Sequence, residues 1–132
     1  MLKQYGAIPF LQDDGELKVV LVTSASGYWI FPKGQYEDDL GKQGTAELEA
    51  FEEAGVKGKL LGKNRYRTKV VVKSGETVRL ILYPLEVQKV FDSWQEDDRR
   101  KRKVVSVPKA LKLMDSDALK DCLRKFQRDY LA

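Results

Sequence analysis

One segment, Tyr28–Val56, constrains the fold of this chain more than any other stretch. Its sequence predicts a short strand, a tight turn at Gly34, a helix over Thr45–Glu53, and a helix end at Gly55, where glycine can take the left-handed conformation. The apolar residues of the predicted helix recur with a helical period and form one face. That face must be buried, so the segment predicts a helix that packs on a core directly after a strand and a turn.

The opposite face of the same helix is acidic. Glu49, Glu52 and Glu53 stand at positions i, i+3 and i+4, so their carboxylates share one side. Like charges at this spacing repel each other, whereas a hard cation such as Mg²⁺ or Mn²⁺ would bind them, because these ions prefer carboxylate oxygens. Three glutamates on one helix face are also a common solvated surface, so the spacing alone leaves both interpretations open.

The composition narrows the chemistry. The chain has no histidine, which excludes Ser-His and Cys-His nucleophiles and a histidine-bound zinc ion. Cys122 is the single cysteine, so no disulfide can form within the chain, and its place on an apolar stripe predicts a small buried hydrophobe. The net charge of +4 suits an anionic ligand such as a phosphate ester, although it is also common as a solubility feature.

The rest of the chain predicts strands first and helices last. Five strands are expected, at Gly6–Phe10, Glu16–Thr23, Thr68–Lys73, Val78–Gln88 and Val104–Val107. The third and fourth form an antiparallel hairpin, and Pro84 in the fourth predicts an edge position or a bulge. A short helix from Pro108 to Met114 and an amphipathic helix over Asp117–Leu131 follow. This order predicts an α+β fold, a mixed sheet with helices on its faces.

The opening segment resembles the Nudix box, the signature G-x5-E-x7-R-E-U-x-E-E-x-G-U of the Nudix hydrolases, in which U is a bulky aliphatic residue. The matching residues are Gly34, Glu49, Glu52, Glu53, Gly55 and Val56, with Ala50 at an aliphatic position. The resemblance implies a single Nudix domain over residues 1–132, with the α/β/α sandwich of that family. It also implies that Glu49, Glu52 and Glu53 hold Mg²⁺ or Mn²⁺ and supply the catalytic carboxylates.

Two residues depart from the signature. Leu40 stands where the family has its first glutamate, and Leu48 stands where it has arginine. In the family these two groups can pair, and the arginine holds the first glutamate of the second half, here Glu49. Replacing both members of a polar pair by apolar residues can be neutral, so we hypothesise that an apolar support has replaced a polar one beneath Glu49. A less firmly held Glu49 predicts slower chemistry.

Basic residues on both sides of the box predict where phosphate is bound. Lys33 and Gly34 end the WIFPKG run, and Lys33 is either a phosphate contact or a solvated lysine at a strand end. The run after Trp94 is similar to the corresponding segment of diphosphoinositol polyphosphate phosphohydrolases, which implies phosphate contacts at Arg100, Lys101 and Arg102. The PKG sequence is closer to the diadenosine tetraphosphate hydrolases.

These observations predict a Mg²⁺-dependent (or Mn²⁺-dependent) pyrophosphohydrolase. Its substrate would be a nucleoside diphosphate derivative, a dinucleoside polyphosphate or a related polyphosphate. The alternatives are a Nudix-fold module with little or no turnover that binds a phosphorylated ligand, and a basic domain that binds RNA. No apolar run is long enough to span a bilayer, and no signal-peptide pattern is present, so we expect a cytoplasmic monomer or homodimer.

Overall fold

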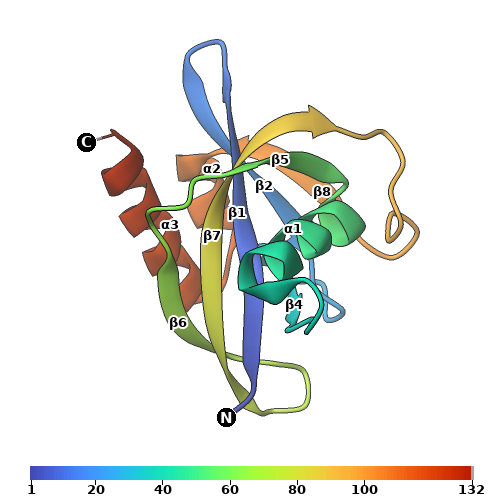
Figure 1. Ribbon diagram of the computed structural model, residues 1–132. Coiled ribbons are helices and arrows are strands. Elements are labelled where there is room, and N and C mark those ends of the chain that lie inside the picture. Colours follow the sequence, from blue (N-terminus) through green and yellow to red (C-terminus); the bar gives the residue numbers. More distant parts are fainter. Residues whose placement is uncertain (132) are drawn as a thin grey trace.

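The computed structural model describes residues 1–131 as a mixed sheet with helices on both faces (Figure 1). The strands are β1 (Lys3–Asp13), β2 (Glu16–Thr23), β3 (Trp29–Ile30), β4 (Lys33–Gln35), β5 (Val56–Leu60), β6 (Tyr66–Val71), β7 (Thr77–Val90) and β8 (Arg102–Ser106). The helices are α1 (Gly41–Ala54), α2 (Val107–Leu113) and α3 (Asp117–Leu131). The predicted α+β class is therefore confirmed.

Strand β1 organises the sheet. It lies parallel to β7 on one side and antiparallel to β2 on the other, in the order β3-β2-β1-β7-β5. Strand β4 also pairs with β1, β6 with β7, and β8 with β2. The pairing of β4 with β1 joins Gly34 to Tyr5, so the turn of the box is attached to the centre of the sheet.

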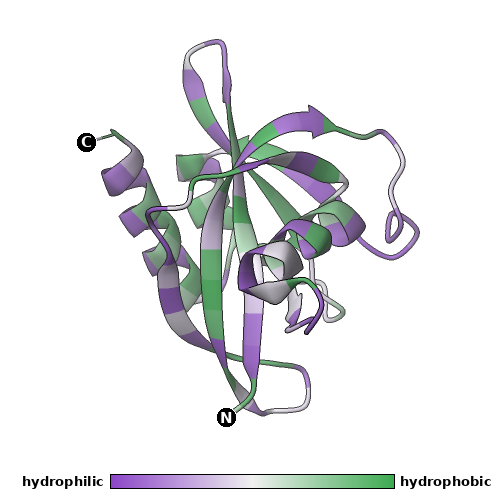
Figure 2. Ribbon diagram, viewed as in Figure 1, coloured by the Kyte–Doolittle hydropathy of each residue, from purple (hydrophilic) through white to green (hydrophobic). Residues whose placement is uncertain are grey.

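Successive side chains of β1 point to opposite faces of the sheet and belong to two separate hydrophobic cores. Ile8 and Phe10 point toward α3, where they join the cluster that includes Phe126. Ala7 points to the opposite face, where it packs with Ala50 of α1. Because neighbouring side chains of a strand face opposite sides of a sheet, α1 and α3 cover opposite faces. The side of α3 that faces the sheet is hydrophobic and its outer side is hydrophilic (Figure 2).

The boundaries predicted from the two strongest sequence patterns are confirmed. Strand β2 spans Glu16–Thr23 and helix α3 spans Asp117–Leu131, as predicted. Helix α1 begins at Gly41, one turn earlier than the predicted Thr45. The buried Thr45 explains the difference, because its hydroxyl donates to the carbonyl of Gly41 and accepts from the backbone N–H of Glu37. These bonds hold the additional turn against the loop that precedes it.

The prediction for Pro84 needs correction. Strand β7 is a central strand, and Pro84 lies in its buried middle, opposite Ile8 of β1. On its other side β7 pairs first with β6, as far as Leu82, and then with β5, from Leu85 onward. Pro84 falls in the gap between these two ladders, where its carbonyl accepts a bond from Leu61. The missing N–H of proline therefore removes no ladder bond.

Candidate active site

The C-terminal end of α1 is anchored from outside the helix. The indole N–H of Trp94 donates to the carbonyl of Glu53 at 2.9 Å, and Nη1 of Arg102 donates to the carbonyl of Ala54 at 2.9 Å. The guanidinium of Arg102 also lies 4.0 Å from the centre of the Trp94 ring. Gly55 ends the helix at φ +64°, and a Cβ there would come within 3 Å of Trp94 and Arg102. Only glycine fits both the conformation and the space.

Glu53 is the buried carboxylate of this site. Its side chain is 7% exposed, and its two oxygens have different partners. Oε1 accepts from the backbone N–H of Lys33 at 3.2 Å, and Oε2 lies 3.3 Å from Nη2 of Arg100. Burial raises the pKa of the Glu53 carboxyl to about 8, although Arg100 opposes the shift. A buried carboxyl group with a raised pKa binds a proton readily, and a metal cation could take the place of that proton.

Glu49 lies beside Glu53, on the backbone of Gly34. A Cβ at position 34 would overlap the Glu49 carboxyl group, so the turn of the box directly supports this side chain. Burial raises the pKa of Glu49, and the charges of nearby acids raise it further. The charge of Glu52 contributes to the raised pKa of Glu49, and the backbone carbonyl of Glu52 accepts from the backbone N–H of Glu96.

The carboxylates of the site supply some of the ligands that a hard divalent cation requires. Two carboxylates converge, and both have raised pKa values because negative charge is crowded and buried there. Within residues 1–131 no three acidic or cysteine side chains are arranged around a common point, so a ligand set of Glu49, Glu52 and Glu53 together stays a prediction. Two carboxylates are enough for Mg²⁺, which usually keeps several waters and takes other ligands from a substrate phosphate. Glu49 and Glu53 would hold it, and a role for Glu52 stays a prediction.

The hypothesis of an apolar support beneath Glu49 is wrong. Leu40 is 44% exposed, and neither Leu40 nor Leu48 belongs to a core cluster. Leu48 instead lines a groove between α1 and β5, together with Phe51 and Val56. Glu49 lies instead against the backbone of Gly34, a residue that this chain shares with the signature.

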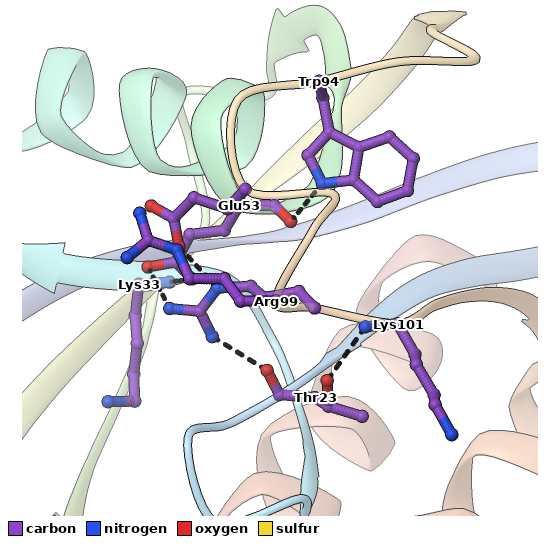
Figure 3. Close-up of polar contacts among 8 residues, drawn as sticks. Thr23, Lys33, Glu53, Trp94, Arg99 and Lys101 are labelled. Carbon is purple, nitrogen blue, oxygen red and sulfur yellow. Dashed lines mark hydrogen bonds and ion pairs between the residues drawn. The ribbon is translucent and has the colours of Figure 1, made fainter.

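The three basic residues predicted to bind phosphate have different places. The guanidinium of Arg100 reaches Glu53, as described above, while Lys101 attaches to Thr23 through its backbone N–H and its side chain points away from Glu53 (Figure 3). Arg102 donates to the carbonyls of Ala54 and Phe91. Of the three, only Arg100 lies beside the carboxylate pair.

Replacing Arg102 by methionine should therefore lower stability. The change leaves the carbonyls of Ala54 and Phe91 without their donor and removes the contact with Trp94, which together should reduce the free energy of unfolding by about 2 kcal/mol. Urea denaturation measures this, and Lys101→Met, an exposed neighbour, should change stability by less than about 0.5 kcal/mol. Unchanged stability with weaker substrate binding would instead favour the phosphate-binding role.

A cavity of about 610 Å³ opens next to the carboxylate pair. Glu53, Lys33 and Arg100 line one part of it. The side chain of Lys33 runs away from Glu53 (Figure 3), and its Nζ donates to Gln4 at 2.6 Å. Burial lowers the pKa of Lys33, with Glu53 opposing the shift. The volume is typical of a pocket for a small molecule.

Sequence reasoning missed three residues of this site. Glu96 accepts from Nε of Arg100 at 2.7 Å, the carbonyl of Thr23 accepts from Nη1 of Arg100, and Gln4 accepts from Lys33. The signal for Glu96 was present, because an acid four residues before an arginine predicts an i,i+4 pair on a helical turn. Thr23 and Gln4 act through long-range contacts that the sequence does not encode in a local pattern.

Comparisons with known proteins agree with this geometry. The family model for the NUDIX domain matches residues 3–126. Nudix hydrolase 21, chloroplastic, of Arabidopsis thaliana is 31% identical over 131 residues, which cover 92% of this chain and 64% of the relative. Diphosphoinositol polyphosphate phosphohydrolase 3-beta of Bos taurus is 32% identical over 117 residues, which cover 85% of this chain and 66% of the relative. The chain belongs to the Nudix family.

The solved structures support the fold. A C. elegans Ap4A hydrolase in a binary complex superposes with a TM-score of 0.81 at 20% identity, covering 99% of this chain and 98% of that one. The chain spans about three fifths of the length of the curated plant relatives. Within residues 1–131, no helix is both long and apolar enough to cross a membrane.

Proposed function

We propose that this protein is a divalent-metal-dependent pyrophosphohydrolase that cleaves a diphosphate linkage in a phosphorylated small molecule. The observation that carries the proposal is the carboxylate pair of the half-buried Glu49 and the buried Glu53 in the helix of the Nudix box, with Arg100 beside Glu53. The family membership of the chain supports the same class of reaction.

Each residue of the site has a role in the proposed reaction. Glu49 and Glu53 would hold Mg²⁺ or Mn²⁺, which when bound activates water and offsets charge on phosphate oxygens. Gly34 positions Glu49, and the backbone N–H of Lys33 positions Glu53. Lys33 and Arg100 supply positive charge in the cavity where the phosphate chain would lie. The proton of the attacking water would go to a carboxylate, for which Glu49, Glu52 and Glu53 are the predicted acceptors.

The lining of the cavity supports a substrate with few charges. Beyond Lys33, Arg100 and Lys73, the walls are largely apolar, with Trp29, Ile30, Val70, Val72 and Leu119. The acids Glu53 and Asp115 also line it. An inositol pyrophosphate carries many phosphates and needs many cations, whereas a nucleoside joined to a short phosphate chain presents one charged end and one flat apolar end. The lining favours the nucleoside derivative.

Phosphate release from a panel of compounds tests both the metal dependence and the substrate class. We expect hydrolysis of dinucleoside polyphosphates or nucleoside diphosphate conjugates with Mg²⁺, at least about tenfold faster than any cleavage of inositol pyrophosphates. Addition of EDTA should abolish product formation, and excess Mg²⁺ should restore it. Faster cleavage of inositol pyrophosphates would contradict the substrate class, and activity that survives EDTA would contradict the role of the metal.

A binding module without turnover is the second candidate function. Two observations favour it: the guanidinium of Arg100 already lies at Glu53, and the box lacks its usual glutamate and arginine at Leu40 and Leu48. This function predicts tight binding of a phosphorylated ligand and no product with any metal. Binding of RNA with a steep salt dependence and no metal dependence would point to the third alternative.

The remaining features of the protein are proposals as well. We propose that residues 1–132 form one domain, since the family model spans residues 3–126 and both cores share one sheet. We also propose that the protein acts in the cytoplasm as a monomer or homodimer. Size-exclusion chromatography with light scattering would decide the oligomeric state.

A further inference from the structure

Arg100 connects three elements at the edge of the cavity. Its Nη2 lies 3.3 Å from Oε2 of Glu53 in α1, and its Nε lies 2.7 Å from Oε1 of Glu96 in the loop before β8. Its Nη1 donates to the carbonyl of Thr23 at the end of β2, at 2.8 Å. The side chain is only 20% exposed, so the guanidinium is held in a fixed place and not free in solvent.

Glu53 does not need Arg100 to stay in position. The backbone N–H of Lys33 binds Oε1, and the carbonyl of Glu53 accepts from the indole of Trp94. The residue also lies within α1, whose neighbouring Ala50 and Ala54 are fully buried in the core. What Arg100 adds is therefore chiefly a positive charge next to Oε2, the oxygen that the N–H of Lys33 leaves available.

We propose that Arg100 is the resident counter-ion of Glu53 and competes with a divalent cation for this carboxylate. The proposal rests on the proposed function, because it takes Glu53 as a metal ligand. A cation at Oε2 would repel the guanidinium, which would shift as one rigid group so that Nη2 loses its contact with Oε2. Since Arg100 lines the cavity, the released N–H groups face the space where a phosphate would lie.

This exchange couples two binding events. Metal binding makes Arg100 available to an anion, and an anion that engages Arg100 makes Glu53 available to metal. Such coupling is reciprocal, so each ligand strengthens the binding of the other by the same factor. Arg100 would then offset part of the charge on Glu53 without a metal, and the site would present its phosphate-binding group only when the metal is present.

Titration of the protein with Mn²⁺ alone, by calorimetry and without substrate, tests the competition. Arg100→Gln should bind Mn²⁺ about tenfold more tightly than wild type, because it removes the competing charge. Arg100→Lys keeps a charge but cannot reach Glu53 and Glu96 together, so about threefold tighter binding is expected. Arg99→Gln, which removes an equal charge at a side chain that is 67% exposed, should change the affinity by less than about twofold.

The outcomes separate this proposal from the proposed function. Weaker or unchanged Mn²⁺ binding by Arg100→Gln would overturn the competition, and weaker binding would make Arg100 a group that positions Glu53. Should Arg100→Gln not fold, the direction of the change in Arg100→Lys decides in the same way. If wild-type protein binds no divalent cation at millimolar concentration, the proposed function itself fails, whatever the variants do.

Discussion

Glu53→Gln should abolish hydrolysis and at the same time stabilise the protein without metal. We expect the rate to fall on the order of 10³-fold, because the amide keeps the shape of the side chain but cannot replace a carboxylate on a cation, and metal catalysis supplies several kcal/mol. The binding of Mn²⁺ should weaken in parallel. A gain in stability together with a loss of activity is expected where a buried charge serves function at a cost in stability.

The expected gain in stability follows from the buried charge. The pKa of Glu53 is about 8 in the fold and near 4.5 in an unfolded chain, so the folded state binds the extra proton between these values. For an acid whose pKa is raised by folding, the stability is fully present below pH 4.5 and is lost as pH rises toward 8. Glutamine has no such loss, which should leave the variant more stable by about 1–3 kcal/mol at pH 8.

Urea denaturation in EDTA, at pH 5 and at pH 8, measures this difference. The wild-type free energy of unfolding should fall between the two pH values, and that of Glu53→Gln should fall less. Arg100 keeps Glu96 and the Thr23 carbonyl as partners in the variant, so it is not left alone. Activity within tenfold of wild type would exclude Glu53 as a metal ligand, and a variant less stable at both pH values would exclude the buried-charge account.

The fold could be predicted from the sequence wherever a pattern is local. Strand β2 is a continuous run of apolar residues between turn signals, and α3 carries a clear apolar stripe after the cap of Ser116, so their boundaries followed directly. Pro84 could not be placed, because its tolerance depends on two other strands, β5 and β6, that end on either side of it. This arrangement depends on tertiary contacts, so no sequence pattern within β7 predicts it.

The individual residues of the site could be predicted from the sequence, but the contact between Glu53 and Arg100 could not. Glu53 and Arg100 each belong to a recognisable pattern, the box and the basic run, but their contact depends on the return of the loop before β8 to Thr23. Five basic residues in succession look alike in sequence, and burial alone separates Arg100 and Arg102 from Lys101. The support of Glu49 was missed because a glycine offers no side chain to predict from.

Gly34→Ala should therefore disable the site through Glu49. The added Cβ would overlap the Glu49 carboxyl group and displace it, and a displacement of about 1 Å at a reacting centre can lower the rate about 10²-fold. Gly34 has an ordinary φ, so alanine adds no backbone strain of its own, and β4 should remain paired with β1. The matched control is Gly62→Ala, where a Cβ would meet no atom within 4 Å.

A double-mutant cycle shows whether the loss passes through Glu49. The affinity for Mn²⁺ is measured in wild type, Gly34→Ala, Glu49→Gln and the double variant, because affinity stays measurable where turnover does not. Gly34→Ala should weaken binding roughly tenfold in the wild-type background and less than about twofold when Glu49 is already glutamine, since groups in contact are not additive. Equal losses in both backgrounds would mean that alanine disturbs the turn itself, and Glu53 alone would then account for the cation site.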